Sequence, residues 1–459
     1  MELPKARKEV QAVRAYLDAS REVDAAGARA GARAGDGWAA PPVAGDGEED
    51  ADGHMERLAA DALGWMFDFL NGSVTVGKRR ERQGMLVQLG AYEVLRDVTL
   101  GPASALSDCA LRALAQLLLL NHRVSRRAIE DGVLDFLAGL AGAEAEAEAG
   151  GGRLPFSRGN LATCLNSITA IVLDAHRKIL SSGTAARVLA QMAADPSCSQ
   201  VQNGQTGMIR NLCFNEDIHD DLVAMGAIDV LLRVSATAHS YHASQALMGV
   251  ACLIGHEEAK GSAELRVEAS PRLVQVIATA LARSLDGKSI DNVLYTPWKI
   301  CLALSKLSAA DPNRELILNS VAAAGGAGGA AAGGADEGNV GGGGGDAGAA
   351  RGGGGRSGEP MLVLLERALW LPPDAEDPYS SRQQVYTTLT IWNLAMLGAR
   401  GVARIRERKG LVRLLTALAT RPCTTFQVAR DELTEDLREQ DEVTENARGI
   451  LLLLNCCSK

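Results

Sequence analysis

A helix–glycine–helix pattern recurs along this chain and constrains its fold more than any other feature. Each copy ends a helical stretch on Ile, Leu or Val, passes a small residue and starts a new apolar helix, as in HDDLVAMGAIDVLLRV. A glycine at a helix end supplies the left-handed backbone that stops one helix and lets the next turn away. The junctions of this kind are Gly90, Gly132, Gly183, Gly226, Ser270, Ser320 and Gly410.

The spacing of the junctions predicts a repeat architecture. Consecutive junctions from Gly90 to Ser320 lie 42, 51, 43, 44 and 50 residues apart. A purely helical period of roughly 40–47 residues is typical of stacked helical repeats. The composition agrees, because 47% of residues are hydrophobic but only 4% are aromatic, which suits stacked helices better than a β-sandwich. We therefore expect an all-α fold, an α-solenoid of about seven repeats.

Changes in composition suggest the domain organisation. We expect residues 1–54 to form an N-terminal helix and a disordered linker, since GARAGARAGDGWAAPPVAGDGEEDADG lacks apolar periodicity. Residues 321–359 are almost entirely Gly and Ala and are expected to form a disordered insertion. Repeats are expected over 55–320, and the C-terminal repeats over 360–459 are expected to continue the same solenoid.

The chain resembles the armadillo-repeat family over about 55–320 and 360–459. The resemblance rests on the junction glycines and on the last helices of the units, IRNLCFN, ALSKLSA and IWNLAML. It implies a right-handed superhelix of three-helix units, whose concave groove is lined by the last helix of each unit. HEAT repeats are the main alternative, but their first-helix proline and Asp/Arg ladder are not regular here.

The resemblance also implies a binding surface. In this family an asparagine on the last helix often faces the groove and hydrogen-bonds the backbone of an extended peptide, a role that suits an amide because it both donates and accepts. The alternative is that such amides cap helices or pair within the solenoid. The predicted partner-binding groove residues are Asn166, Asn211, Asn215, Ser305 and Asn393.

Neither catalysis nor a cofactor is expected. The sequence has no GxSxG, HExxH or kinase signature. The DGKS stretch at 286–289 lacks both the first glycine of a phosphate-binding loop and a preceding strand. No metal site is expected either, because the spacing of His239, His242, Cys252 and His256 matches no standard zinc site.

Charge and cysteine usage limit the partners. A net charge of −9 argues against nucleic acid as the main partner. The basic runs KRRER and RGVARIRERK are expected to be solvated faces, with docking of an acidic partner or anionic lipid as the alternative. No apolar run is long enough to span a membrane, and MELPKARKEV has no apolar core for a secretory signal. The nine scattered cysteines favour a reducing compartment, so we expect the cytoplasm, with the nucleus also possible.

These features favour a non-catalytic protein–protein interaction scaffold that binds an extended peptide or protein partner and is monomeric. The alternative is a regulatory, exchange-factor or chaperone-like platform for a GTPase or other client. A nuclear-import cargo adaptor is a further alternative. The adaptors of this family carry a tryptophan four residues before each groove asparagine. Those positions hold Ala162, Gly207 and Leu389 here, so this chain lacks the tryptophan array and the adaptor alternative is weakened.

Overall fold

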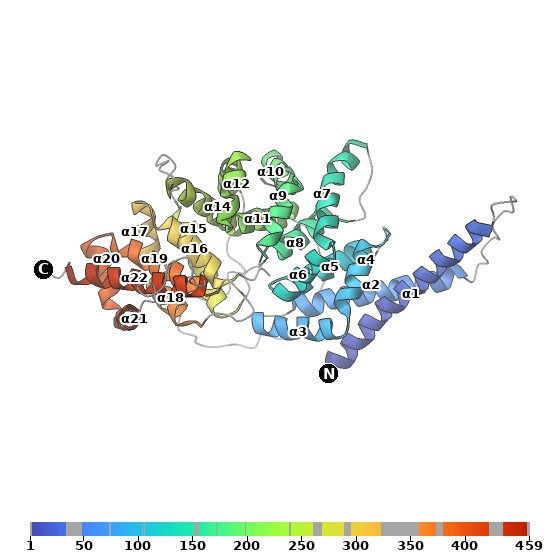
Figure 1. Cartoon of the computed structure of the whole chain (residues 1–459), viewed down its shortest axis with the longest axis horizontal. Helices are drawn as coiled ribbons and strands as arrows, with labels where there is room; N and C mark the ends of the chain where they lie inside the picture. Colours follow the sequence, from blue (N-terminus) through green and yellow to red (C-terminus); the bar gives the residue numbers. More distant parts are fainter. Residues whose placement is uncertain are drawn as a thin grey trace, which may run out of the picture. The chain divides into compact units, whose positions relative to one another are not determined.

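The described part of the chain is built from helices. The computed structural model describes residues 2–33, 48–72, 75–102, 104, 106–150, 156–170, 172–197, 199–237, 240–259, 269–288, 295–322, 358–372, 380–421 and 435–456. These residues form no named strand, and Val321 and Pro360 make an isolated antiparallel bridge. The helices divide into two compact units, of which unit 1 holds α1 to α14 and unit 2 holds α15 to α22 (Figure 1).

Unit 1 begins with two long helices and continues with shorter ones. Its helices are α1 (Glu2–Arg33), α2 (Glu48–Asn71), α3 (Val76–Gln88), α4 (Ala91–Leu100), α5 (Ser107–Leu118), α6 (His122–Glu130), α7 (Val133–Gly150), α8 (Arg158–Thr169), α9 (Asp174–Ser181), α10 (Thr184–Ala194), α11 (Ser199–Cys213), the 3-10 turn η2 (Glu216–Ile218), α12 (His219–Ala224), α13 (Ala227–Thr237) and α14 (Ser240–Ala259).

Four consecutive three-helix repeats make up most of unit 1. They are α3–α4–α5, α6–α7–α8, α9–α10–α11 and α12–α13–α14. The last helices stack in order, α2 on α5, α5 on α8, α8 on α11 and α11 on α14. The second helices α4, α7, α10 and α13 also contact one another in this order. Each repeat therefore buries its apolar stripe against its neighbours, as in a solenoid.

Unit 2 repeats the same scheme. Its helices are α15 (Pro271–Leu285), α16 (Pro297–Leu307), α17 (Asp311–Asn319), α18 (Met361–Trp370), α19 (Arg382–Ala395), α20 (Ala399–Glu407), α21 (Lys409–Ala419) and α22 (Glu435–Cys456). The last helices α16, α19 and α22 stack in order, as do the second helices α15, α18 and α21. The predicted all-α solenoid is thus confirmed. Besides the N-terminal helices α1 and α2, the described residues hold six three-helix repeats and one pair of helices, α15–α16.

The junction glycines take the predicted left-handed conformation at four positions. Gly90, Gly132, Gly183 and Gly226 have φ values of 82°, 79°, 71° and 75°. Each lies between the first and second helix of a repeat, so the boundary between repeats lies earlier. In the stretch around Gly226, for example, the preceding repeat ends with α11 at Cys213, and Asn215 precedes the next short helix.

The seventh junction is placed differently from the prediction. Gly410 is the second residue of α21 and is not left-handed. The turn between α20 and α21 is made by Arg408, with φ −89° and ψ 75°. Ser270 does start a helix as predicted, because its hydroxyl accepts a hydrogen bond from the Leu273 amide and Pro271 occupies the first turn.

The ends of the Gly/Ala-rich insertion are held together. The Ala322 amide donates to the Glu359 carbonyl at 2.9 Å, and the Met361 amide donates to the Ser320 carbonyl at 3.1 Å. Residues 323–357 of the predicted insertion lie outside the described residues. The insertion therefore connects α17 and α18, the first and second helices of one repeat, and the residues at its two ends are hydrogen-bonded to each other.

The N-terminal helix belongs to unit 1. Helix α1 buries Ala6, Val10 and Val13 and packs against α2, α3 and α4. Most of the predicted linker, residues 34–47, lies outside the described residues, and the boundary placed at residue 54 falls within α2. None of the described helices has both the length and the apolar character needed to cross a membrane.

Candidate functional site

The asparagine that the sequence places in the groove lies in the interior of unit 1. Asn211 is 0% exposed on α11. Its Nδ2 donates to the carbonyl oxygen and to Oδ1 of Asn166 on α8, at 3.2 and 2.9 Å, and its Oδ1 accepts from Arg210 at 2.9 Å. The amide therefore joins the last helices of two successive repeats.

Unit 2 contains an equivalent contact. Asn393 on α19 donates through Nδ2 to the Ser305 carbonyl at 3.1 Å and to the Ser308 hydroxyl at 2.9 Å. Ser305 itself is 2% exposed, and its hydroxyl donates to the Leu302 carbonyl within α16. Here too a polar side chain forms hydrogen bonds between two stacked last helices.

Asn215 has a third role. Its Oδ1 accepts from the Asp217 amide at 3.2 Å, so it caps the short helical turn that opens the next repeat. Of the five predicted groove residues, Asn211, Asn215 and Ser305 are buried, and Asn166 and Asn393 are half-buried. The contacts are the pairing and capping within the solenoid that the sequence left as the alternative. A role of these five residues in binding a partner stays a prediction.

Buried polar side chains at another position serve the ends of the last helices. His176 and His219, both 1% exposed, contact the Thr169 and Cys213 carbonyls through Nε2 at 2.9 and 2.7 Å. Ser125 donates to the Leu118 carbonyl at 3.0 Å. Each stands seven residues before a left-handed glycine and contacts a carbonyl at the end of a last helix, where carbonyl groups lack a partner within the helix. These histidines are thus structural.

A group of three or more side chains able to hold a metal is not found among the described residues. Of the four residues of the histidine and cysteine set, His239 lies outside the described residues, as does the side chain of His256. Cys252 is buried at 1% exposure in α14. Cys164, Cys213 and Cys301 are likewise buried, and burial raises the pKa of each thiol, that of Cys301 to about 12.

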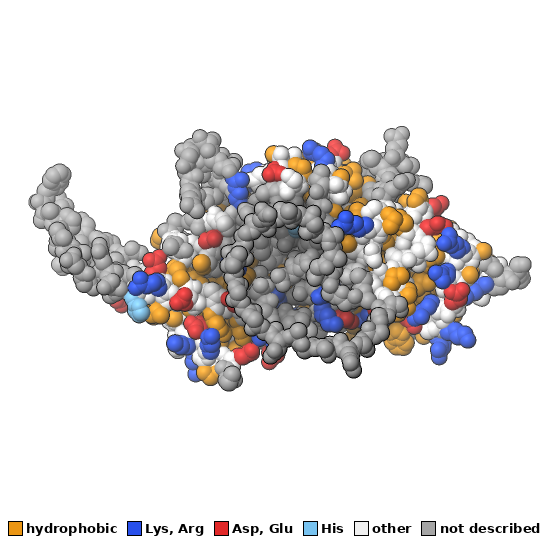
Figure 2. All heavy atoms as spheres, turned by 180° about the vertical axis from the view of Figure 1, so that it is seen from behind, with side chains coloured by type: hydrophobic (Ala, Val, Ile, Leu, Met, Phe, Trp, Pro, Cys, Tyr) orange, Lys and Arg blue, Asp and Glu red, His pale blue; other side chains and the backbone are white. Residues whose placement is uncertain are grey.

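The first helices of the repeats in unit 1 differ in the sign of their charge. Helix α3 has Lys78, Arg79, Arg80 and Arg82 against Glu81, whereas η2 and α12 have four acidic residues and no Lys or Arg. On the face shown in Figure 2, cationic and anionic side chains are interspersed among apolar ones. The charge of the first helices therefore changes sign from one end of unit 1 to the other.

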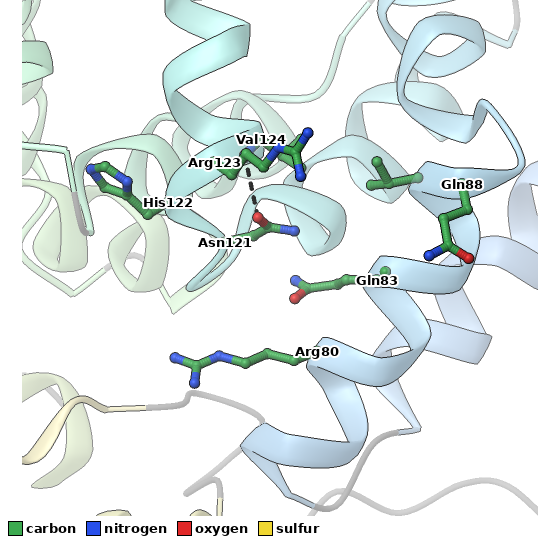
Figure 3. Close-up of a pocket in the computed structure, with 9 residues that line it drawn as sticks. Arg80, Gln83, Gln88, Asn121, His122, Arg123 and Val124 are labelled. Atoms are coloured by element: carbon green, nitrogen blue, oxygen red, sulfur yellow. Dashed lines mark hydrogen bonds between the residues drawn. The ribbon is translucent and has the colours of Figure 1, made fainter. Parts of the chain in front are cut away.

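A hollow of about 410 Å³ lies between the first helices α3 and α6. Figure 3 shows the side chains of Arg80 and Gln83 extending from α3 toward Asn121, which caps α6. The other lining residues are Gly84, Val87, Gln88, His122, Arg123 and Val124. Among the described residues the lining contains two arginines and one histidine but no Asp or Glu.

The inner wall of the hollow is rigid. Gln83 is 1% exposed, and its Nε2 donates to the carbonyls of Gln116, Leu117 and Leu119 at 3.0, 3.1 and 2.8 Å. One helical turn earlier, Arg79 is also 1% exposed and donates to Gln116 Oε1 at 2.7 Å. Burial lowers the pKa of Arg79 to about 10, so its guanidinium stays charged near neutral pH.

Comparisons with known proteins give similarity in structure only. No protein-family model and no curated protein matches the sequence. One similar solved structure comes from a study of the phosphorylation-controlled interaction between cadherin and beta-catenin, at 13% identity and a TM-score of 0.46. The match covers 89% of this chain and 66% of that one, so this chain spans just under two thirds of its length.

Two engineered proteins are also similar. One matches at 14% identity and a TM-score of 0.39, over 87% of this chain and 85% of that one. A designed armadillo repeat protein matches at 14% identity and a TM-score of 0.30, over 79% of this chain and 98% of that one. Because these TM-scores are low, the fold is assigned from the chain's own geometry.

That geometry combines three-helix units, a left-handed glycine between first and second helices, and stacked last helices. The fold is an armadillo-like helical repeat. The hollow between α3 and α6 was not anticipated from the sequence, although KRRER marks its basic helix. The signal that would have found it is an alignment of the armadillo-like repeats on their junction glycines.

Proposed function

We propose that this armadillo-like chain is a non-catalytic scaffold that binds a protein partner through an extended segment. The observation that carries the proposal is the hollow between α3 and α6, a preformed recess with rigid walls and cationic lining on a repeat scaffold. Repeat arrays offer long surfaces for extended partners, and a recess among charged side chains gives such a surface a point of specificity.

The buried polar side chains of both units favour a scaffold over an enzyme. The buried asparagines and histidines are engaged in contacts between helices, and three of the buried cysteines have raised thiol pKa values, which favour the unreactive protonated form. A reactive cysteine or base would instead stand near a substrate-sized cleft with its pKa moved toward neutrality.

We also propose that the protein works in a reducing compartment, the cytoplasm or the nucleus. The described cysteines are free thiols, namely Cys109, Cys164, Cys213, Cys252, Cys301 and Cys456. Imaging of the intact chain fused to a fluorescent protein tests this location. A secreted or luminal signal would contradict it.

The test of the scaffold function is reconstitution. The intact chain is used for affinity purification, and the recovered partner is then purified and mixed with it at known concentrations. We expect a reversible complex of fixed stoichiometry by size-exclusion chromatography with light scattering. Mass spectrometry should find the partner covalently unchanged. Conversion of the partner by the chain, or the absence of a reproducible complex, would contradict the proposal.

A further inference from the structure

Two large apolar side chains are exposed near the ends of neighbouring helices in unit 2. Met396, the residue after α19, is 52% exposed, and Leu452 on α22 is 65% exposed. Single exposed apolar residues are ordinary on a protein surface, whereas a contiguous apolar patch indicates an interaction site. The packing of α19 against α22 decides between the two.

Helices α19 and α22 pack side by side and run parallel. The Asn446 side chain donates through Nδ2 to the Thr388 hydroxyl at 3.4 Å. About one turn further along both helices, Gly449 lies against the Trp392 ring, with which a Cβ at this glycine would clash. Because the two contacts advance together along both helices, the C-terminal ends of α19 and α22 lie beside each other.

The next turn of the two helices brings apolar side chains together. Met396 stands four residues after Trp392. Leu453 stands four residues after Gly449, so it lies beside Met396 at the ends of the helices, with Leu452 next to it in the sequence. Trp392 and Leu453 are half-buried. The four side chains Trp392, Met396, Leu452 and Leu453 form what we call the α19–α22 patch.

The two exposed members of the patch lie on the side away from the core. The core side carries Leu394 on α19 and Ile450 on α22, both 0% exposed. Met396 and Leu452 stand two residues after them, a step of about 200° around a helix. Both side chains therefore face outward on the same surface of unit 2.

A carboxylate accompanies the patch on α22. Glu445 stands seven residues before Leu452, which places it on the same side of the helix two turns away. It is exposed and forms no ion pair with the residues that the structure describes. Arg448, on the following turn, donates to the Ala419 and Arg421 carbonyls at 2.9 and 3.2 Å, at the end of α21. The patch is thus apolar with a negative charge at its border.

We propose that the α19–α22 patch binds an apolar side chain in a peptide segment of a protein partner, while Glu445 pairs with a Lys or Arg of the same segment. Contact with the patch removes apolar surface from water, and the carboxylate selects the charge of the segment. The same carboxylate disfavours an anionic lipid surface. This inference rests on the scaffold function proposed above and specifies the chemistry of a segment that the scaffold binds.

The first test uses a random dodecapeptide phage library, which is depleted on Leu452→Glu and then panned on the intact wild-type chain. We expect the recovered peptides to share a large apolar residue accompanied by Lys or Arg. A fluorescein-labelled copy of the leading peptide should bind Leu452→Glu at least about tenfold more weakly than wild type, because a charge replaces the apolar contact. Recovered peptides without this pattern would overturn the proposal.

The matched control is Leu58→Glu, the same substitution at a leucine on α2 in unit 1 that is 43% exposed. It should change peptide affinity less than about twofold, because distant sites act independently. Leu452→Glu should keep the wild-type thermal midpoint, since the side chain is exposed. Leu452→Ser adds no charge and should still weaken peptide binding at least about threefold. Equal losses in Leu58→Glu and Leu452→Glu would contradict the assignment of the patch.

The second test reverses the charge at the border of the patch. Glu445→Lys should weaken binding of the basic peptide about threefold to tenfold. Replacing the Lys or Arg of the peptide by Glu should restore its affinity for this variant. Unchanged binding by Glu445→Lys, or no recovery with the charge-swapped peptide, would rule out the pairing with Glu445.

Other occupants of the patch give distinct results. If a second copy covers the patch, light scattering of the intact chain should detect a dimer that Leu452→Glu dissociates. If a membrane covers it, vesicles of phosphatidylcholine and phosphatidylserine should sediment with wild type but not with Leu452→Glu. Either result would overturn the proposal. A reconstituted partner that binds wild type and Leu452→Glu equally would exclude the patch but leave the scaffold function standing.

Discussion

At the scale of single residues, polar side chains inside the array have one recurrent use: they satisfy backbone groups of a neighbouring helix. Asn211 donates to the Asn166 carbonyl, Asn393 to the Ser305 carbonyl, and His219 contacts the Cys213 carbonyl. Such contacts tie one repeat to the next, because the unpaired donor or acceptor left behind would cost about 1–3 kcal/mol in a dry interior.

The first prediction follows from this use of the asparagines. Asn211→Ala should lower the free energy of unfolding by about 2–3 kcal/mol, since it leaves Asn166 and Arg210 without an amide partner in the interior. Asn393→Ala should cost about 1 kcal/mol because that side chain is half-buried. Urea denaturation followed by circular dichroism measures both. An Asn211→Ala protein of unchanged stability that has lost partner binding would instead return this residue to a binding role.

The second prediction concerns a hydrogen-bonded network between α4 and the end of α6. Burial alone would raise the pKa of Asp131, but hydrogen bonds from Arg96 and Tyr92, both at 2.9 Å, hold it below its usual value. A carboxylate whose pKa is lowered by folding stabilises the protein above its unfolded pKa, about 3.9, and loses this contribution as pH falls through the folded value.

Asp131→Asn should therefore lower the free energy of unfolding by about 1–2 kcal/mol at pH 7, from the loss of charged hydrogen bonds. The gap between variant and wild type should narrow below about pH 4, because the Asp131 carboxylate is protonated first in the unfolded chain and, at still lower pH, in the folded one. Asp61→Asn, at an exposed position on α2, is the control with no comparable loss. A gap that stays constant from pH 7 to pH 3 would show that the Asp131 charge does not contribute.

The sequence was a poor guide at this scale for a definable reason. Asparagine spacing identified residues on the last helices, and the structure places Asn166, Asn211 and Asn393 there, whereas Asn215 lies beyond the end of α11. Whether an amide on a helix faces a groove or a neighbouring helix depends on how far apart the helices stack, and one chain's periodicity does not report that. In the structure, α11 is buried on all sides from Gly204 to Cys213, and this stretch includes Asn211.

At the scale of helices and turns, the glycine pattern was the most reliable signal. A left-handed residue is required where a short first helix reverses into the second, and glycine is the one residue without a Cβ penalty there. The prediction failed at Gly410 because the turn from α20 to α21 uses Arg408 at a negative φ of −89°, which does not need a glycine. A glycine in the sequence marks such a turn only where φ must be positive.

The third prediction uses two glycines with opposite roles. Gly226→Ala should lower the free energy of unfolding by about 1–2 kcal/mol. Since φ is +75° and nothing lies within 4 Å of the new Cβ, the penalty is backbone strain alone. Gly84→Ala should instead stabilise by about 0.5–1 kcal/mol, because Gly84 lies inside α3 with open space around it. Urea midpoints that move in the same direction for both variants would contradict this reading of the turns.

At the scale of the whole molecule, the approximate repeat count was predictable, because it follows from the spacing of the junctions. The charge reversal along the first helices was not, since it emerges only when repeats are aligned on their glycines. The hollow at the step from α3 to α6 is lined by Gly84, and no motif records the absence of a side chain there.

The last prediction concerns the insertion as part of the whole chain. Ala322 and Glu359 are hydrogen-bonded although 36 residues separate them, so folding must close this loop. Replacing residues 323–357 by four Gly and Ser residues, with Gly358 kept because a Cβ there would clash with the Ala322 carbonyl, should stabilise unit 2 by about 2 kcal/mol. A Gly and Ser segment of the original length should leave the urea midpoint unchanged. If that length-matched control is destabilised, the native segment makes contacts that the paired base alone does not explain.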